Sequence, residues 1–182
     1  GSRNFATKLW NATRFAMMNG ATVEGELPAV DSLNAIDKWI LSRLSETISE
    51  VDSLLEKYEF ARACELLYHF AWDDLCDWYL ELSKETFAGD ETDKTKRVLG
   101  HVLDQLLRLL HPVMPFITEQ LWTTLTGAES LVIATWPVAN AAHVDKASEK
   151  LVAEMQEIIT DVRRFRNDQG IKTSLKIPAR FV

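Results

Sequence analysis

A short segment near the start of the chain carries residue types that could bind single-stranded nucleic acid. At about 100° per residue, Lys8, Asn11 and Phe15 fall on one side of a helix, and Arg14 lies next to them. Cationic side chains attract phosphate, and an exposed aromatic ring can stack on an unpaired base. The alternative is that Phe15 only widens the buried stripe of the helix and the cations are solvated. That stripe, which we expect to face a core, consists of Phe5, Leu9, Ala12 and Ala16.

A row of carboxylates is the strongest candidate for catalysis. Asp73, Asp77 and Glu81 recur at every fourth residue and so could share one face of a helix, where paired carboxylates can act as acid and base. Such rows are usually solvated, and we interpret this one as a structural acidic face that also discourages misplaced RNA. The sequence has no glycine-rich phosphate loop and no nucleophile–base pair. We therefore predict no catalytic residue in this chain.

The cysteines and histidines do not form a metal-binding pattern. Cys64 and Cys76 are not part of a CxxC motif, and we expect both to be buried, reduced thiols. No two histidines have ligand spacing on one helix face, so we predict no metal site. The histidines are His69, His101, His111 and His143.

Most tryptophans have the spacing of core residues. Trp10 differs because it lies beside Arg3 and Arg14, and we expect it to pack against another helix. The tryptophans expected in the core are Trp39, Trp72, Trp78, Trp122 and Trp136.

A second basic region lies near the end of the chain. Arg163, Arg164 and Arg166 could contact the RNA backbone, or they could only complement the negative end of a helix dipole. The sequence leaves both interpretations open. The basic end continues with Lys172, Lys176 and Arg180.

The distribution of charge argues against indiscriminate binding to nucleic acid. The net charge is −7, yet the only charged side chains in residues 1–23 are Arg3, Lys8 and Arg14. This asymmetry suits a protein that meets RNA at selected places. No apolar run has membrane-spanning length and the first residues do not form a signal peptide, so we expect a cytoplasmic protein. The first two residues, Gly1 and Ser2, are typical of an expression scar.

Hydrophobic periodicity predicts a mainly α protein, an antiparallel helical bundle with a small C-terminal helix-plus-strand appendage. We expect the bundle to span residues 3–138 and the appendage residues 139–182. Residues 131–133 could be a strand or a packed loop, and alternation from Leu175 to Phe181 predicts a strand. The expected long helices span about residues 2–19, 31–58, 60–86, 92–110 and 145–169. A short helix is expected to pass through Trp122 and Leu125.

Three blocks give the chain a family resemblance. KLWNATRF, residues 8–15, closely resembles the opening helix of the anticodon-binding domain of bacterial valyl-tRNA synthetases, which are class I aminoacyl-tRNA synthetases. Residues 72–84 and 111–122 resemble two further signatures, and Trp136-Pro137 lies where that family has a Trp-Pro pair. The resemblance covers essentially the whole chain after Ser2. The isoleucyl and leucyl relatives share the helical plan but are less similar at these positions.

The resemblance implies a role in recognition of the anticodon arm of tRNA(Val). Lys8, Arg14 and Phe15 match positions that contact the anticodon in the family; Asn11 shares their face, and Arg3 lies nearby. The parent enzyme would use ATP with Mg to ligate valine to tRNA. The catalytic motifs HIGH and KMSKS are absent here and would lie upstream, and a coiled coil would follow Val182. We therefore expect an inactive, monomeric fragment without its own cofactor. Its expected partners are the anticodon arm of tRNA(Val) and the catalytic domain of the same parent chain. The rival interpretations are an acidic helical protein-interaction bundle, or the equivalent domain of an isoleucyl- or leucyl-tRNA synthetase.

Overall fold

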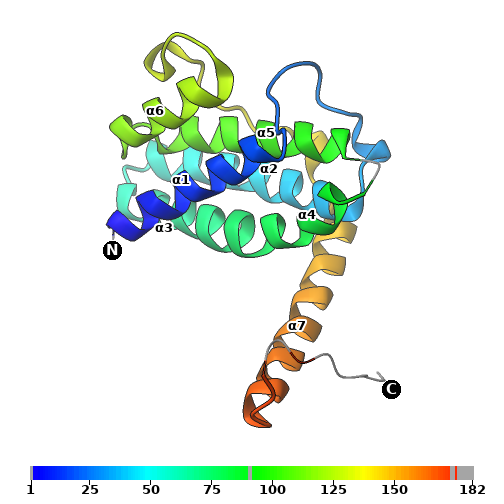
Figure 1. The fold of residues 1–182 in the computed structure, drawn as a ribbon. Coiled ribbons are helices and arrows are strands. Elements are labelled where there is room, and N and C mark those ends of the chain that lie inside the picture. The colour runs from blue at the N-terminus through cyan, green and yellow to red at the C-terminus, as the bar shows by residue number, and fades with distance from the viewer. Residues whose placement is uncertain (1, 90–91, 173–174, 176–182) are drawn as a thin grey trace.

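Helices form all of the longer elements in the computed structural model, which describes residues 2–89, 92–172 and 175 (Figure 1). No strand is present in that part of the chain, so the predicted mainly α bundle is confirmed. The principal elements are α1 (Ser2–Met18), α2 (Ala35–Glu56), α3 (Phe60–His69), the π segment η2 (Phe70–Tyr79), α4 (Leu80–Phe87), α5 (Asp93–Leu110), α6 (Pro115–Thr126) and α7 (Lys146–Asp168). Short 3₁₀ turns lie at η1 (Val30–Ser32), η3 (Leu131–Ile133) and η4 (Ala141–His143).

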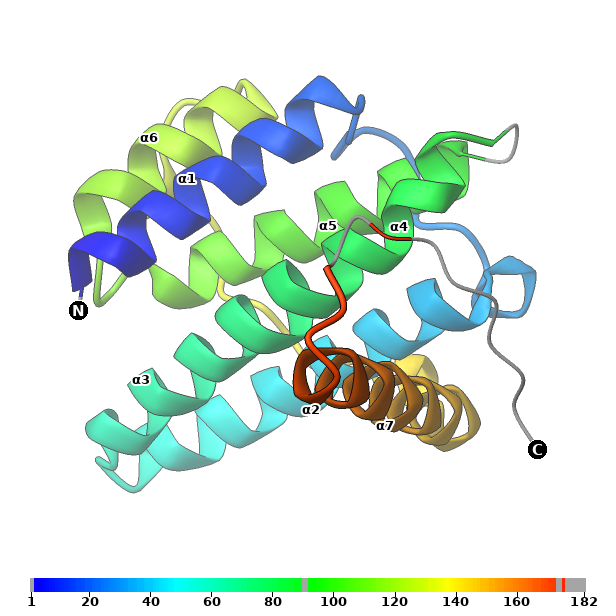
Figure 2. The same cartoon turned by 60° about the horizontal axis from the view of Figure 1, so that its bottom comes forward.

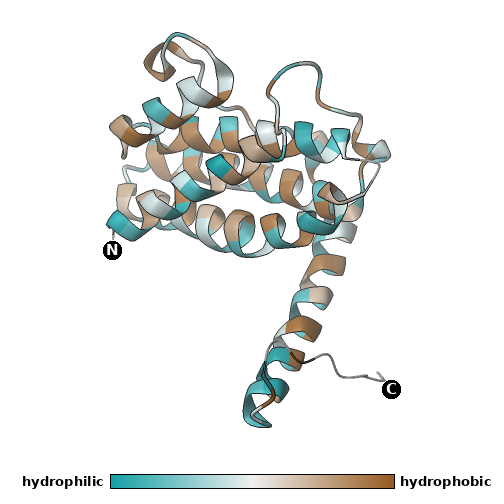
Figure 3. Cartoon of the chain, in the orientation of Figure 1, coloured by the Kyte–Doolittle hydropathy of each residue, from teal (hydrophilic) through white to brown (hydrophobic). Residues whose placement is uncertain are grey.

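The core forms where the apolar stripes of the helices meet. α5 contributes most to the core, because it packs against α2, α6 and α1. Buried residues therefore occur around most of the circumference of this helix. Colouring by hydropathy shows apolar segments on every helix of the bundle (Figure 3). The predicted stripe of α1 is confirmed, since Phe5, Leu9, Ala12 and Ala16 are all buried.

Residues 60–87 form a continuous helical stretch, as predicted, but its middle is a π-helix. The π segment η2 spans Phe70–Tyr79, and its wider i→i+5 turns bring Phe70, Leu75 and Tyr79 into the core. The periodicity of the sequence did not distinguish this segment from an α-helix.

A buried polar cluster joins α2 to η2 and α5. Asp37, which is 1% exposed, accepts hydrogen bonds from the Tyr79 hydroxyl at 2.6 Å and the Thr95 hydroxyl at 2.6 Å. The side-chain amide of Asn34 donates a third at 2.8 Å, and the Asn34 side chain caps α2 by accepting from the Asp37 backbone N–H. Burial raises the pKa of Asp37 more than these hydrogen bonds lower it. The cap at Asn34 explains why α2 begins at Ala35, after the predicted start at residue 31.

The end of α1 and the following loop have a fixed place over α5. Gly20, with φ of 77°, gives the predicted left-handed exit of α1. The loop then crosses α5 so closely that a Cβ at Gly100 would lie 2.0 Å from the carbonyl oxygen of Thr22. Gly100 therefore holds the loop against the bundle by having no side chain.

The segment after α6 differs in part from the predictions. Residues 131–133 form a 3₁₀ turn and not a strand, with Leu131 buried and the backbone N–H of Leu131 bonded to Glu119. Trp136, expected in the core, is 38% exposed, and its indole N–H donates to Asp52 at 2.8 Å. Trp39 and Trp122 are buried as predicted, and Trp72 and Trp78 are half-buried. The predicted strand lies almost entirely outside the described residues; Leu175, which is described, has no regular structure.

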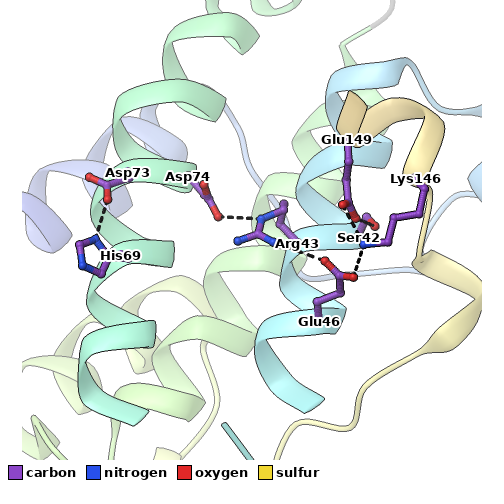
Figure 4. A network of polar contacts seen from close by, with 8 residues as sticks. All are labelled: Ser42, Arg43, Glu46, His69, Asp73, Asp74, Lys146 and Glu149. Carbon is purple, nitrogen blue, oxygen red and sulfur yellow. Dashed lines mark hydrogen bonds and ion pairs between the residues drawn. The ribbon is translucent and has the colours of Figure 1, made fainter. Parts of the chain in front are cut away.

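α7 begins against α2 and then extends away from the bundle (Figure 1). Asp145 caps it by accepting from the Ser148 backbone N–H. A polar network, drawn in Figure 4, fixes this start: Glu149 accepts from Ser42 of α2, and Lys146 pairs with Glu149 at 2.9 Å and also with Glu46. Arg43 of α2 pairs with Asp74 of η2 at 3.1 Å, which links the same network to the middle of the bundle.

Candidate nucleic-acid interface

α1 lies on the outside of the bundle, with α6 along one flank and η2 along the other (Figure 2). The face opposite its buried stripe is open to solvent, and the residues exposed there come from successive turns of the helix. These residues are Arg3, Asn4, Thr7, Trp10, Asn11, Arg14, Met17 and Met18. The predicted RNA-binding residues therefore do not all share one environment.

Lys8 lies on the flank beside η2 and is already engaged. Its Nζ is 2.5 Å from Asp77 Oδ1 and 3.8 Å from the centre of the Trp72 ring. The Lys8 side chain as a whole is 24% exposed. Binding a phosphate or a base edge here would mean sharing Lys8 with Asp77.

Phe15 lies on the same flank, and its environment corrects the expectation of an exposed ring. Phe15 is half-buried, packs against the core and meets Phe87 of α4 edge-on, with ring centres 6.0 Å apart. The Asn19 side chain donates to the Phe15 carbonyl at 2.8 Å. Phe15 thus widens the apolar stripe, and only part of the ring remains for a ligand.

Arg3, Asn11 and Arg14 are exposed, as the helical spacing predicts. Arg3 and Arg14 make no ion pair with any other residue in the described ranges. Arg14 lies between the two flanks of α1 and is therefore the cation best placed to meet a ligand that crosses this face.

The aromatic ring with the largest exposed fraction on the described part of α1 is Trp10. It is 47% exposed and lines a groove together with Leu121 and Thr124 of α6, so it lies beside another helix but is not buried there. This groove, lined by residues of both helices, has a volume of about 300 Å³. Its exposure could not be read from the sequence, because large rings are usually buried and only the cationic neighbours of Trp10, Arg3 and Arg14, set it apart.

The second basic region lies at the far end of α7 and is well separated from α1 in both views (Figures 1 and 2). Its three arginines make contacts within the protein. Arg164 pairs with Asp161 at 2.8 Å, and the Arg163 guanidinium lies 5.6 Å from the centre of the Trp78 ring. Arg166 donates to the backbone carbonyls of Lys172 and Leu175, beyond the end of the helix. Lys176 and Arg180 lie outside the described residues.

The carboxylates of the acidic row are paired separately. Asp73 meets His69 at 2.7 Å, Asp77 meets Lys8, and Glu81 meets Lys84 at 2.7 Å. Each of the three carboxylates thus has a basic partner of its own.

Among the described residues, no group of three or more His, Cys, Asp or Glu side chains could hold a metal ion. Cys64 and Cys76 are free and half-buried, and burial raises the pKa of the Cys76 thiol to about 12. At neutral pH this thiol is therefore protonated and weakly nucleophilic. Of the helices in the described ranges, none combines the length and apolarity needed to cross a membrane.

Comparison with known proteins matches this sequence to one family. The family model described as "Anticodon-binding domain of tRNA ligase" matches residues 37–181. The chain is 59% identical to a valine–tRNA ligase of Streptomyces avermitilis over 99% of its own length and 21% of the relative's. It is 54% identical to that of Nocardia farcinica, over 100% and 20%, and 55% identical to that of Mycobacterium tuberculosis H37Rv, over 98% and 20%. The chain thus spans about a fifth of the length of these relatives, and it belongs to the family of tRNA ligase anticodon-binding domains.

Proposed function

We propose that this chain is the part of a valine–tRNA ligase that binds the anticodon arm of tRNA(Val), and that the exposed face of α1 makes the contact. The observation that carries the proposal is the pair of exposed arginines on that face, Arg3 and Arg14, neither of which has an acidic partner in the described structure. The whole chain has a net charge of −7, although residues 1–23 carry three cations and no acidic residue. An RNA loop is therefore attracted to α1, while the excess of acidic residues in the other helices of the bundle opposes binding there.

Different residues of this face have different tasks in the proposal. Arg14 is exposed, and its planar guanidinium group can donate two parallel hydrogen bonds to a phosphate or to the acceptor edge of a base. Asn11, one turn earlier, offers both a donor and an acceptor to a base. Lys8 contributes charge from the flank, where Asp77 and Trp72 fix its position. Phe15 offers a partly covered ring at the edge of the face.

The proposal extends to the longer enzyme. Such a ligase would couple valine to tRNA with ATP and Mg bound by its catalytic domain, in the cytoplasm, while this part stays without a cofactor and without catalytic residues. Valine codons begin with GU, so the anticodon ends in AC, and those two bases are the ones that α1 would read. We propose that the domain acts as a monomer. The arginines at the end of α7 are a weaker candidate for RNA contact, because they have partners within the protein.

The flank of α1 is tested by comparing Phe15→Ala with Lys8→Ala in the full-length ligase, read as kcat/KM for aminoacylation. If Phe15 stacks on a base, Phe15→Ala lowers kcat/KM by a factor equivalent to about 1–3 kcal/mol of binding free energy. The salt dependence should not change, because stacking releases no counterions. If Lys8 meets a phosphate, its loss reduces the slope of log Kd against log salt by about one.

Two controls separate binding from packing. Phe60→Ala removes another exposed phenyl ring, at the start of α3, and should leave kcat/KM unchanged. Asp77→Asn frees Lys8 without removing it; a loss equal to that of Lys8→Ala would show that the ion pair matters only for structure. If Phe15→Ala leaves kcat/KM unchanged in a folded enzyme, Phe15 is structural and has no part in recognition.

A further inference from the structure

The groove between α1 and α6 has the composition of a site for one planar base. The residues that line it, here called the Trp10 groove, are Trp10, Thr13, Arg14, Met17 and Met18 of α1 and Leu121 and Thr124 of α6. Its volume of about 300 Å³ is at the lower end of the range for small-ligand sites, which begins near 300 Å³. The groove is therefore of a size for a single ring system and too small for a helix.

The charge of the groove favours a nucleic-acid ligand. Arg14 is the one charged residue in its lining, and none of the lining residues is acidic. An apolar side chain from a protein partner would need no cation, whereas a nucleotide brings a phosphate for the guanidinium and a ring for the indole. The exposed Thr124 hydroxyl donates its proton to the Gln120 carbonyl at 2.7 Å, so its oxygen can serve a base only as an acceptor.

The difference in exposure between the rings of Trp10 and Phe15 also favours a base in the Trp10 groove. Trp10 is 47% exposed, while Phe15 is half-buried against Phe87. The two rings lie on opposite flanks of α1, about a helix diameter apart, so they cannot hold the same base. An RNA strand that crosses the helix over Asn11 and Arg14 would bring one unpaired base to each flank.

We propose that the Trp10 groove holds a second unpaired base of the anticodon loop, stacked on the Trp10 indole, with Arg14 bonded to the adjoining phosphate. This inference rests on the proposed function and deepens it. Because every base has a stacking face, Trp10 contributes affinity that does not depend on base identity, whereas the polar residues of α1 supply the discrimination.

The test is binding of tRNA(Val) to the full-length ligase carrying Trp10→Ala or Trp10→Phe. Trp10→Ala is expected to raise Kd about 5- to 150-fold for tRNAs with either the AC ending or another ending, with an unchanged salt slope. Trp10→Phe, which keeps an aromatic face, is expected to retain most of the affinity. Trp136→Ala is the matched control, since Trp136 is also partly exposed but bonds to Asp52 on another part of the bundle.

A crosslinking experiment locates the base directly. A tRNA with a photoreactive uridine in the anticodon loop is expected to crosslink to a peptide containing Trp10, Met17 or Met18. Unchanged Kd for Trp10→Ala, together with weaker binding by Arg14→Ala, would overturn this inference and leave the proposed function standing. Unchanged Kd for both variants would overturn both. A Trp10→Ala enzyme that loses thermal stability but binds tRNA normally would show that a protein segment fills the groove.

Discussion

Arg14→Ala is expected to weaken binding of tRNA(Val) by about 1–3 kcal/mol, which is roughly 5- to 150-fold in Kd. Arg14 is exposed at the centre of the α1 face, lines the Trp10 groove and has no acidic partner among the described residues. Its removal therefore breaks no ion pair among the described residues, and a loss of affinity reports a contact with RNA. The measurement is Kd for tRNA in the full-length ligase at several salt concentrations.

Two further variants show whether an effect of Arg14→Ala comes from a specific contact or from the change in net charge. Arg14→Lys keeps the charge but loses the planar fork, so it should restore binding if the contact is a single phosphate and fail to do so if the contact is bidentate. Arg62→Ala removes an exposed arginine of α3 that pairs with Glu59, and it changes the net charge by the same amount. If Arg62→Ala weakens binding as much as Arg14→Ala, the effect is one of net charge and α1 has no special role.

Asp37→Ala is expected to have the largest effect on stability, lowering the free energy of unfolding by about 3–5 kcal/mol. The change removes the acceptor of three side-chain hydrogen bonds, so the buried hydroxyls of Tyr79 and Thr95 lose the group to which they donate. Because Asp37 joins α2 to η2 and α5, the loss should affect the whole bundle. Denaturant unfolding monitored by circular dichroism measures it, and a change below 1 kcal/mol would show that the cluster is not a structural link.

Asp37 should also make the free energy of unfolding depend on pH. The pKa of Asp37 is raised in the folded state by burial, so the folded state holds this proton more tightly than the unfolded state. Its contribution to stability is therefore complete below the ordinary pKa of an aspartate and is lost as pH rises through the raised pKa. Asp37→Asn, which cannot ionise, should remove this part of the pH dependence.

The sequence was sufficient for the helices and for the core face of α1. Apolar residues at spacings of three and four predicted Leu9 and Ala16 as buried, and Pro112 and Gly20 predicted two helix ends correctly. These features follow from local periodicity and backbone geometry, which one stretch of sequence specifies by itself.

The environment of each site residue could not be predicted in the same way, because it depends on the neighbours of α1. Phe15 is half-buried because Phe87, distant in sequence, packs against it, and Lys8 is paired because η2 presents Asp77. Trp10 is exposed because α6 leaves a groove beside it. A helical wheel gives the direction of each side chain, but only the packing of α6, η2 and α4 decides which directions remain open.

The central claim is that α1 reads the anticodon, and its most direct test is discrimination between tRNAs that differ only in the last two anticodon bases. We expect wild-type full-length ligase to prefer the AC ending in kcat/KM. Lys8→Ala is expected to reduce that preference by about 1–3 kcal/mol through the loss of a base contact, whereas Arg14→Ala, which removes a phosphate contact, is expected to lower kcat/KM for both tRNAs. Trp10→Ala should lower kcat/KM for both tRNAs without changing their ratio. A preference for AC that is the same in wild-type enzyme and in Lys8→Ala would contradict the account, because the anticodon would then be read elsewhere.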